Sequence, residues 1–208
     1  QSEESLKEKN IESCSFEVDV NNESSCQELV NATKSKFGRI DILVNNAGTN
    51  IRKKPENYEL TEWTSIINTN LVSMFICSKA CFSHFCESGQ GKIINIGSGY
   101  SIKAAAGNAA YAASKAGLWN MTRSMALDWG EDNIQVNMIL PGWISTEMTT
   151  DALGDIKRKN KIISETPAGK IGEPEDITGA AVFLASGASD FVTGKYIQVE
   201  GGRHAGDM

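Results

Sequence analysis

Short apolar runs alternate along the chain with longer segments that have the periodicity of amphipathic helices. The runs are rich in β-branched residues, and several are apolar on both faces, as strands buried in a parallel sheet are. We expect strands at residues 15–20, 40–45, 92–96, 134–140 and 196–199. The alternation predicts an α/β domain with a doubly wound parallel sheet.

The helical segments fall between these runs. We expect helices at residues 23–37, 60–87, 109–129, 149–164 and 174–186. Gly38 closes the first of them, and Pro174 suits the first turn of the last. The pattern weakens over residues 145–170, which we expect to form a mobile lid over a substrate. The 208 residues are enough for one domain, and we treat residues 1–208 as that single unit.

Charge and composition narrow the class of partner. The net charge is −6 and the isoelectric point is near 5.1, which does not favour a nucleic-acid partner, because such proteins usually carry a basic face. No window approaches the roughly 18 uninterrupted apolar residues of a membrane span, and the first ten residues do not resemble a signal peptide. We therefore expect a cytoplasmic protein that acts on a small molecule.

The five cysteines are irregularly spaced, as is typical of free thiols in a reducing compartment. The chain has two histidines and no CxxC motif, so we predict no metal site.

Tyr111 and Lys115 stand four residues apart in the alanine-rich stretch NAAYAASKAG, so they share one face of a predicted helix. On an isolated helix such a pair is usually solvated. The pair could equally be an acid and the cation that tunes it, and spacing alone does not decide between the two.

Distinctive residues stand where predicted strands end. NNAG occupies residues 45–48, Ser98 follows a second strand, and the PGWIST loop at residues 141–146 follows a third. Open α/β sheets build their sites at the carboxyl ends of strands. These motifs, with Ser98 thirteen residues before Tyr111 and a terminal VEGG, resemble the short-chain dehydrogenase/reductase family over residues 15–202.

The resemblance implies a Rossmann-like fold, NAD or NADP as cofactor, and interconversion of a secondary alcohol and a ketone. It implies that Tyr111 is the catalytic acid/base, that Lys115 is its partner and that Ser98 orients the carbonyl. Asn70 matches the residue that organises a proton-relay water.

The resemblance also implies a set of cofactor contacts besides those of Tyr111 and Lys115. Asp19 and Val20 match residues near the adenine ring. Asn45, Ala47 and Gly48 match the turn that packs against the adenosine ribose. The loop around the nicotinamide corresponds to Pro141, Gly142, Ile144 and Thr146.

The implied chemistry needs these residue types. A tyrosine with an ordinary pKa of about 10 is a poor base near neutrality. A cation nearby lowers that pKa, and we expect Lys115 to supply the charge. The Ser98 hydroxyl can donate or accept a hydrogen bond as the substrate oxygen changes between carbonyl and alkoxide.

Three further stretches resemble one branch of the family. TNIRKKP, NIGSGYS and LPGWISTEMT look like sugar-acid oxidoreductases of the gluconate 5-dehydrogenase and 2-deoxy-gluconate 3-dehydrogenase type, although ketoacyl-reductase-like enzymes share most of this pattern. Arg52 could bind a sugar-acid carboxylate or belong to a solvated basic run with Lys53 and Lys54. We expect Tyr100 and Trp143 to line the substrate pocket.

Members of the family commonly associate through the two long helices beside the active site. These helices correspond to residues 60–87 and 109–129, and the second has apolar residues on more than one side. We therefore expect a homotetramer or homodimer.

The departure from the family pattern lies at the beginning of the chain. The glycine-rich TGxxxGxG turn that holds a cofactor pyrophosphate is absent from residues 1–40. We expect the natural protein to be longer, with the unit of residues 1–208 incomplete at its N-terminus. Because that turn is absent, a non-enzymatic function is the alternative to the oxidoreductase. The chain would then be a catalytically silent family member that serves as an oligomerisation or interaction partner.

Overall fold

A computed structural model of the protein describes residues 6–206, so both ends of the 1–208 unit lie just outside it. All strand pairs of its sheet are parallel, and the order β1-β2-β3-β4 follows the sequence. The strands are β1 (Ile42–Asn45), β2 (Gly91–Ile96), β3 (Ile134–Pro141) and β4 (Tyr196–Val199). Four of the five predicted strands are therefore confirmed, three with ends shifted by one or two residues.

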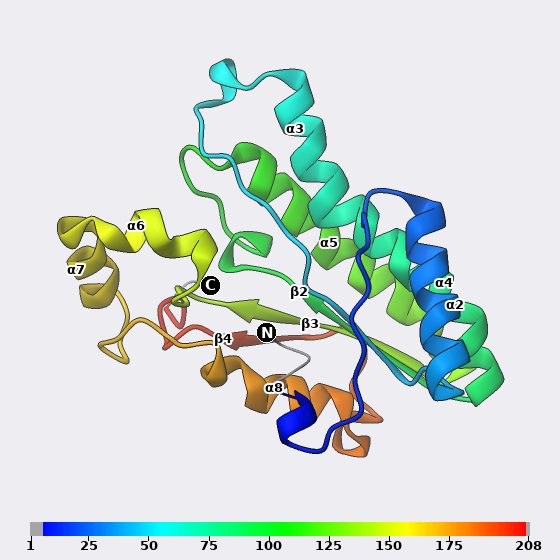
Figure 1. Ribbon diagram of the computed structural model, residues 1–208. Helices are drawn as coiled ribbons and strands as arrows, with labels where there is room; N and C mark the ends of the chain where they lie inside the picture. Colours follow the sequence, from blue (N-terminus) through cyan, green and yellow to red (C-terminus); the bar gives the residue numbers. More distant parts are fainter. Residues whose placement is uncertain (1–5, 207–208) are drawn as a thin grey trace.

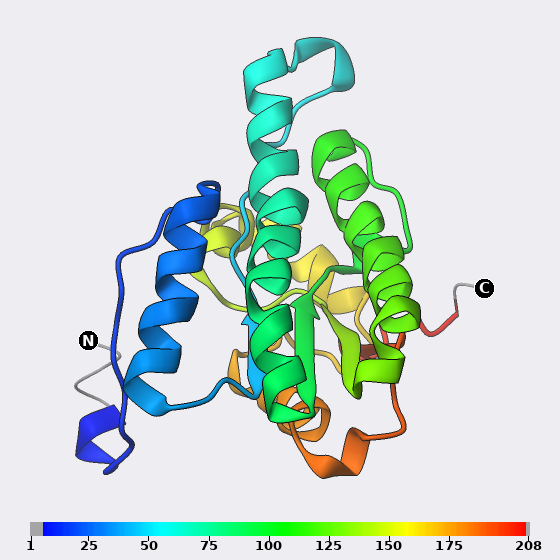
Figure 2. The same cartoon turned by 90° about the vertical axis from the view of Figure 1, so that its right-hand side faces the viewer.

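Helices cover both faces of this sheet (Figures 1 and 2). On one face α4 (Ser73–Ser88) contacts β1 and β2, α5 (Ala109–Asp128) contacts β3, and α2 (Glu23–Phe37) lies beside α4. On the other face α8 (Glu175–Ala185) contacts β2, β3 and β4. The predicted doubly wound α/β architecture is confirmed.

The sheet is buried between two apolar layers. On the α4 side, Phe85 packs with Ile93 and Val136, and all three are almost wholly inaccessible to solvent. On the α8 side, Leu184 packs with Ile94 and Ile139. Successive side chains of β2 and β3 point alternately to the α4 side and the α8 side, and both sides are apolar. Both strands are therefore continuous apolar runs in the sequence.

The strand predicted at residues 15–20 is wrong. That segment is extended but forms no ladder with the sheet. A strand exists only where a neighbour supplies hydrogen-bond partners, and this segment pairs with none of the described strands. The edge strand β1 pairs only with β2 among the described strands, and its Ile42 and Val44 are 43% and 50% exposed.

The helix predicted at residues 60–87 is one continuous helical stretch with a change of pitch inside it. It consists of α3 (Leu60–Ile67), a π-helical turn at Asn68–Val72 and α4. By length and composition alone, Leu60–Ser88 could cross a membrane. Its buried Asn70, Ser73 and Ser78, and its packing on the sheet, are features of a core helix in a folded domain.

The helix predicted at residues 149–164 is in fact two short helices, α6 (Thr150–Gly154) and α7 (Ile156–Ser164). Asp155 separates them because its backbone is extended and its carboxylate caps α7, accepting hydrogen bonds from the amides of Lys157 and Arg158. Both helices lie at the same end of the sheet as the carboxyl ends of its strands (Figure 1).

Candidate active site

A cavity of about 680 Å³ opens at the carboxyl ends of β1, β2 and β3. It is where parallel α/β sheets build their sites, because the loops that follow the strands converge there. Twelve of the residues predicted for the site line it: Ala47, Gly48, Arg52, Ser98, Tyr100, Tyr111, Lys115, Pro141, Gly142, Trp143, Ile144 and Thr146. The tertiary structure thus brings residues from four separate segments to one place.

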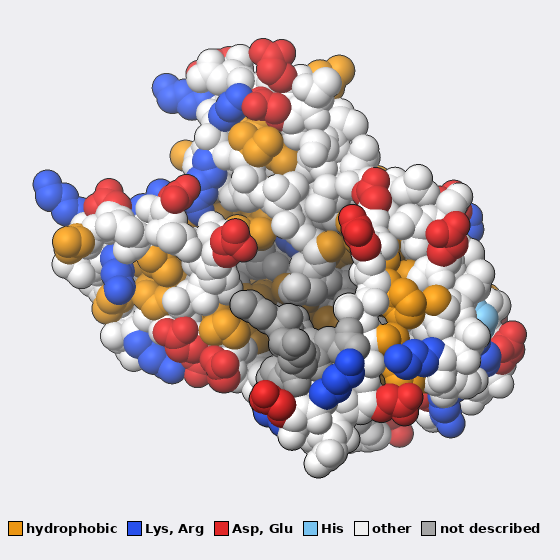
Figure 3. All heavy atoms as spheres, in the orientation of Figure 1, with side chains coloured by type: hydrophobic (Ala, Val, Ile, Leu, Met, Phe, Trp, Pro, Cys, Tyr) orange, Lys and Arg blue, Asp and Glu red, His pale blue; other side chains and the backbone are white. Residues whose placement is uncertain are grey.

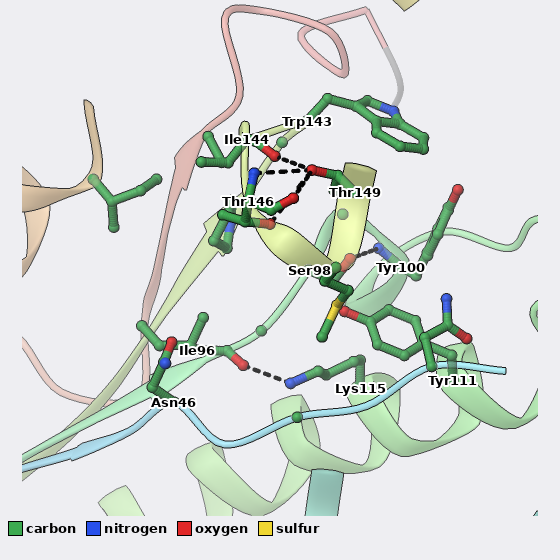
Figure 4. A pocket seen from close by; sticks show the side chains of 18 of the residues that line it. Asn46, Ile96, Ser98, Tyr100, Tyr111, Lys115, Trp143, Ile144, Thr146 and Thr149 are labelled. Carbon is green, nitrogen blue, oxygen red and sulfur yellow. Dashed lines mark hydrogen bonds between the residues drawn. The ribbon is translucent and has the colours of Figure 1, made fainter. Parts of the chain in front are cut away.

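Ser98 and Tyr111 face each other across the cavity floor (Figure 4). Ser98 follows β2 and is the N-cap of a short 3-10 turn at Gly99–Ser101. Its hydroxyl accepts a hydrogen bond from the backbone amide of Tyr100 (3.3 Å). The Tyr100 ring meets the Tyr111 ring edge to face, with centroids 6.1 Å apart. This packing holds the Tyr111 ring with its hydroxyl toward Ser98.

The Tyr111 hydroxyl is a weaker acid here than in water. Burial raises its pKa, while a hydrogen bond with Ser98 and the positive charge of Arg52 act in the opposite direction. The hydroxyl is therefore protonated at neutral pH, ready to donate to a developing alkoxide.

Lys115 is almost fully buried, with 3% of its surface exposed. Its Nζ donates to the carbonyl oxygen of Ile96 (2.8 Å) and lies 5.8 Å from the Tyr111 ring centroid. Burial lowers the pKa of Lys115 to about 8. The predicted lowering of the Tyr111 pKa by Lys115 is not found in this geometry, because the ammonium group points to the end of β2 instead (Figure 4).

Asn70 lies behind the cavity rather than in it. Its Oδ1 accepts from the amide of Thr49 (2.8 Å), and its Nδ2 donates to the carbonyl of Thr49 (2.9 Å) and to the hydroxyl of Ser114 (3.1 Å). The π-helical turn places this fully buried side chain between the loop after β1 and α5. Asn70 therefore ties the two elements that carry Gly48 and Lys115, and its role toward a relay water stays a prediction.

The residues predicted near the adenosine are not all in the cavity. Asn45 is buried under it, and its Nδ2 donates to Ser78 and Asn95 (3.1 and 2.9 Å), so its side chain belongs to the framework of the sheet. Asp19 and Val20 do not line the cavity; the Asp19 carboxylate accepts from the amide of Asn21 at the entry to α2. Their contacts with a cofactor stay predictions.

Eleven of the residues that line the cavity were not predicted from the sequence, and His204 and Asn46 are two of them. His204, from the chain that follows β4, packs against Gly99, where a Cβ would stand 2.5 Å from the ring. Burial lowers its pKa, and its Nδ1 lies 3.1 Å from Glu200. Asn46, between two predicted residues, also lines the wall. Neither carries a local signal, because only the fold brings residues 46 and 204 near Ser98.

The cavity fits the nicotinamide end of a dinucleotide. Gly48 leaves the wall open where a Cβ would stand 3.4 Å from Asn70 Oδ1 and 3.8 Å from Lys115 Nζ. A buried ammonium, the backbone of residues 46–48 and the Thr146 hydroxyl offer donors and acceptors suited to a ribose and a carboxamide. Among the described residues, no group of three or more His, Cys, Asp or Glu side chains is placed to hold a metal.

Known proteins are similar in sequence to this chain over most of its length. A family model described as Enoyl-(Acyl carrier protein) reductase matches residues 1–204. Gluconate 5-dehydrogenase of Gluconobacter oxydans (strain 621H) is 39% identical over 184 residues, which are 88% of this chain and 72% of that protein. 2-Dehydro-3-deoxy-D-gluconate 5-dehydrogenase of Escherichia coli (strain K12) is 42% identical over 175 residues, 84% of this chain and 69% of that protein.

A solved structure shares the fold as well. A gluconate 5-dehydrogenase from Burkholderia cenocepacia J2315, in complex with NADP and tartrate, superposes with a TM-score of 0.94 at 34% identity. The match covers 97% of this chain and 79% of that one. Since sequence, fold and the arrangement around Tyr111 agree, the chain belongs to the short-chain dehydrogenase/reductase family of NAD(P)-dependent oxidoreductases.

Proposed function

We propose that the protein interconverts a secondary alcohol and a ketone on a sugar acid, such as gluconate or a deoxy- or keto-gluconate. The observation that carries this proposal is a guanidinium, that of Arg52, in the same cavity as Ser98 and Tyr111. Relatives whose names specify gluconate or deoxygluconate substrates support it. A sugar acid has both groups that such a cavity suits: hydroxyls to react and a carboxylate to bind.

Each residue has a part in this reaction. The Ser98 hydroxyl donates to the substrate oxygen and orients it toward Tyr111. The Tyr111 hydroxyl gives a proton to that oxygen in ketone reduction, and the Tyr111 phenolate takes the hydroxyl proton in alcohol oxidation. The Lys115 ammonium, at the end of β2, would hold the cofactor's ribose. NAD or NADP, when bound, supplies or accepts the hydride.

Charge pairing separates Arg52 from the lysines that follow it. Lys53 is neutralised by Glu62 of α3, with Nζ 2.5 and 2.7 Å from its two carboxylate oxygens. Arg52 has no ion pair with any described residue, and it lines the cavity where Lys53 does not. This difference favours the interpretation of Arg52 as a residue that binds substrate over that of a solvated basic run. Tyr100 and Trp143 then form walls of the substrate pocket.

The 145–170 segment serves, in this proposal, as the lid. Its α6 and α7 are short and largely exposed, and four of its residues before α6, at positions 146–149, line the cavity. Few buried contacts hold it, which is what a segment that opens for substrate requires.

A substrate panel tests the proposal. The purified protein is assayed with NAD and NADP on gluconate and 2-deoxy-gluconate, and with NADH and NADPH on their keto forms. A ketoacyl thioester is run beside them, because the family model's description refers to an acyl-carrier-protein reductase. Higher kcat/KM on the thioester would replace the sugar-acid assignment with the carbonyl-reductase alternative.

Cofactor binding decides between an enzyme and a silent interaction partner. Nicotinamide fluorescence is followed while the protein is titrated with NADH and NADPH. Saturable binding of either one is expected. No binding of either would favour the non-enzymatic alternative.

We also propose a homodimer or homotetramer built on α4 and α5. The support is apolar side chains that stay in water on these helices, with Phe75 of α4 46% exposed and Leu127 of α5 84% exposed. Light scattering after gel filtration should give a multiple of the chain mass, and Phe75→Glu should shift the protein toward monomer. A monomeric parent protein would refute this.

A further inference from the structure

Two guanidinium groups stack on one indole ring at the mouth of the cavity. The Cζ of Arg52 lies 5.4 Å from the centroid of the Trp143 ring, and the Cζ of Arg158 lies 5.6 Å from it. Arg52 comes from the loop after β1, Trp143 from the loop after β3, and Arg158 from the first turn of α7. Three elements that are far apart in sequence therefore meet at this ring.

Neither arginine has an acidic partner among the described residues, which sets them apart from nearby cations. Lys53 pairs with Glu62, Lys170 pairs with Asp176, and Arg203 pairs with Glu165. In a protein with a net charge of −6, acidic side chains were available for such pairing. Two like charges drawn to one ring and left uncompensated form a site that favours an anion.

The surface around the cavity carries both kinds of charge. In Figure 3, the Lys and Arg side chains over α6 and α7 and over the segment that leads into α3 stand among Asp and Glu side chains. Arg52 also faces the chemistry, because its charge opposes the rise that burial causes in the Tyr111 pKa. A ligand that touches Arg52 is thus within electrostatic reach of the catalytic hydroxyl.

We propose that Arg52, Trp143 and Arg158 form a carboxylate subsite, in which the substrate carboxylate bridges the two guanidinium groups while Trp143 holds them in place. This subsite rests on the proposed function and specifies how the substrate is oriented in the cavity. The substrate carboxylate lies under α7, and the carbon that reacts lies at Ser98 and Tyr111. Guanidinium groups suit a carboxylate because their planar donors match its two oxygens.

The subsite also couples the substrate to the 145–170 segment. Arg158 stands in the capped first turn of α7, where the Asp155 carboxylate accepts a hydrogen bond from the Arg158 backbone amide (3.2 Å). Arg52 lies on a loop tied to α5, since Lys53 bridges to Asn108. A carboxylate bound by both arginines joins α7 to the body of the protein, so the acid group of the substrate is what draws α7 over it.

Two measurements on the purified protein test this subsite. Calorimetric titration with tartrate, a small dicarboxylate, in the presence of NADP measures anion binding without turnover. Steady-state kinetics compare gluconate with its neutral amide, gluconamide. The variants are Arg52→Gln, Arg158→Gln and the double variant. The matched control is Lys157→Gln, which removes one positive charge from the same turn of α7 without touching Trp143.

Each arginine variant should raise the tartrate Kd and the gluconate KM about tenfold, and the double variant about a hundredfold, as expected for lost charge-assisted hydrogen bonds. The KM for gluconamide should be the same in all variants, and Lys157→Gln should match the parent. Arginine variants that bind tartrate and turn over gluconate like Lys157→Gln overturn the subsite and leave the proposed function standing. If tartrate binding needs both arginines but gluconate is not turned over, the subsite stands and the sugar-acid assignment falls.

Discussion

The floor and the roof of the cavity are built in opposite ways. The floor, made by Ser98, Tyr111 and Lys115, comes from the end of β2 and from α5, and Tyr111 and Lys115 are 9% and 3% exposed. The roof is the proposed lid, residues 145–170, whose Met148 and Ile156 are 55% and 73% exposed. Rigid elements hold the groups that need fixed geometry, and in the proposed function a loosely packed segment meets the variable part of the substrate.

Hydrogen bonding follows the same division. The floor is tied across the fold, with Lys115 bound to Ile96 and Asn70 bound to Thr49 and Ser114. The roof is mostly tied to itself, as where the Thr149 hydroxyl donates to the carbonyl of Thr146 (3.0 Å). Substitutions in the floor should therefore change chemistry and stability, and substitutions in the roof should change substrate affinity.

The largest expected effect is on the floor, from Tyr111→Phe. The ring packing on Tyr100 is kept while the acid/base hydroxyl is lost, so kcat should fall by roughly 10²- to 10⁴-fold with cofactor affinity unchanged. Because the Tyr111 pKa is raised, alcohol oxidation by the parent protein should accelerate as pH rises. Stopped-flow assays and NADH titration measure both. Tyr196→Phe, at the far sheet edge, is the control, and equal turnover of the two variants would contradict the assignment.

The next effect is a gain in stability from Lys115→Met. The folded-state pKa of about 8 is below the ordinary 10.5, so the charged side chain destabilises the fold fully below pH 8 and ceases to do so above pH 10.5. The variant should lose turnover. Its free energy of unfolding at pH 7.5 should nevertheless be about 1–3 kcal/mol higher than that of the parent protein, after allowance for the lost hydrogen bond to Ile96.

Urea unfolding of both proteins at pH 7.5 and at pH 10 measures this difference, which should shrink at the higher pH. A methionine variant less stable than the parent at pH 7.5 would mean that the bond to Ile96 outweighs the burial of the charge.

The smallest expected effect is on the roof, from Arg203→Gln. Arg203, in the chain after β4, donates to the carbonyl of Ile162 (2.9 Å) and pairs with Glu165 at the end of α7. Its loss should loosen α7, raising substrate KM about two- to fivefold with kcat unchanged and stability lowered by less than about 1 kcal/mol. Hydrogen exchange in α7 should quicken. The control is Lys161→Gln, whose exposed ammonium faces the same carboxylate at 3.8 Å, and an equal change there would refute the anchor.

Much of the floor could be predicted because its residues carry local signals. Strands buried on both faces leave continuous apolar runs, and Tyr111 and Lys115 share one helical face whatever surrounds them. The residues at strand ends could be grouped because parallel strands end at one edge. The segment at 15–20 failed for the converse reason, since pairing depends on a neighbour and not on composition.

By itself, the sequence determined the order of helices and strands and the family motifs at residues 45–48, 98, 111 and 115, because periodicity and short spacings are local properties. Only the tertiary structure decided where charges point. It turned Lys115 toward Ile96 and paired Lys53 with Glu62. It also placed Arg158 over the ring of Trp143 and brought His204 to the cavity that holds Tyr111. Electrostatics depends on distance in space, and the fold sets that distance.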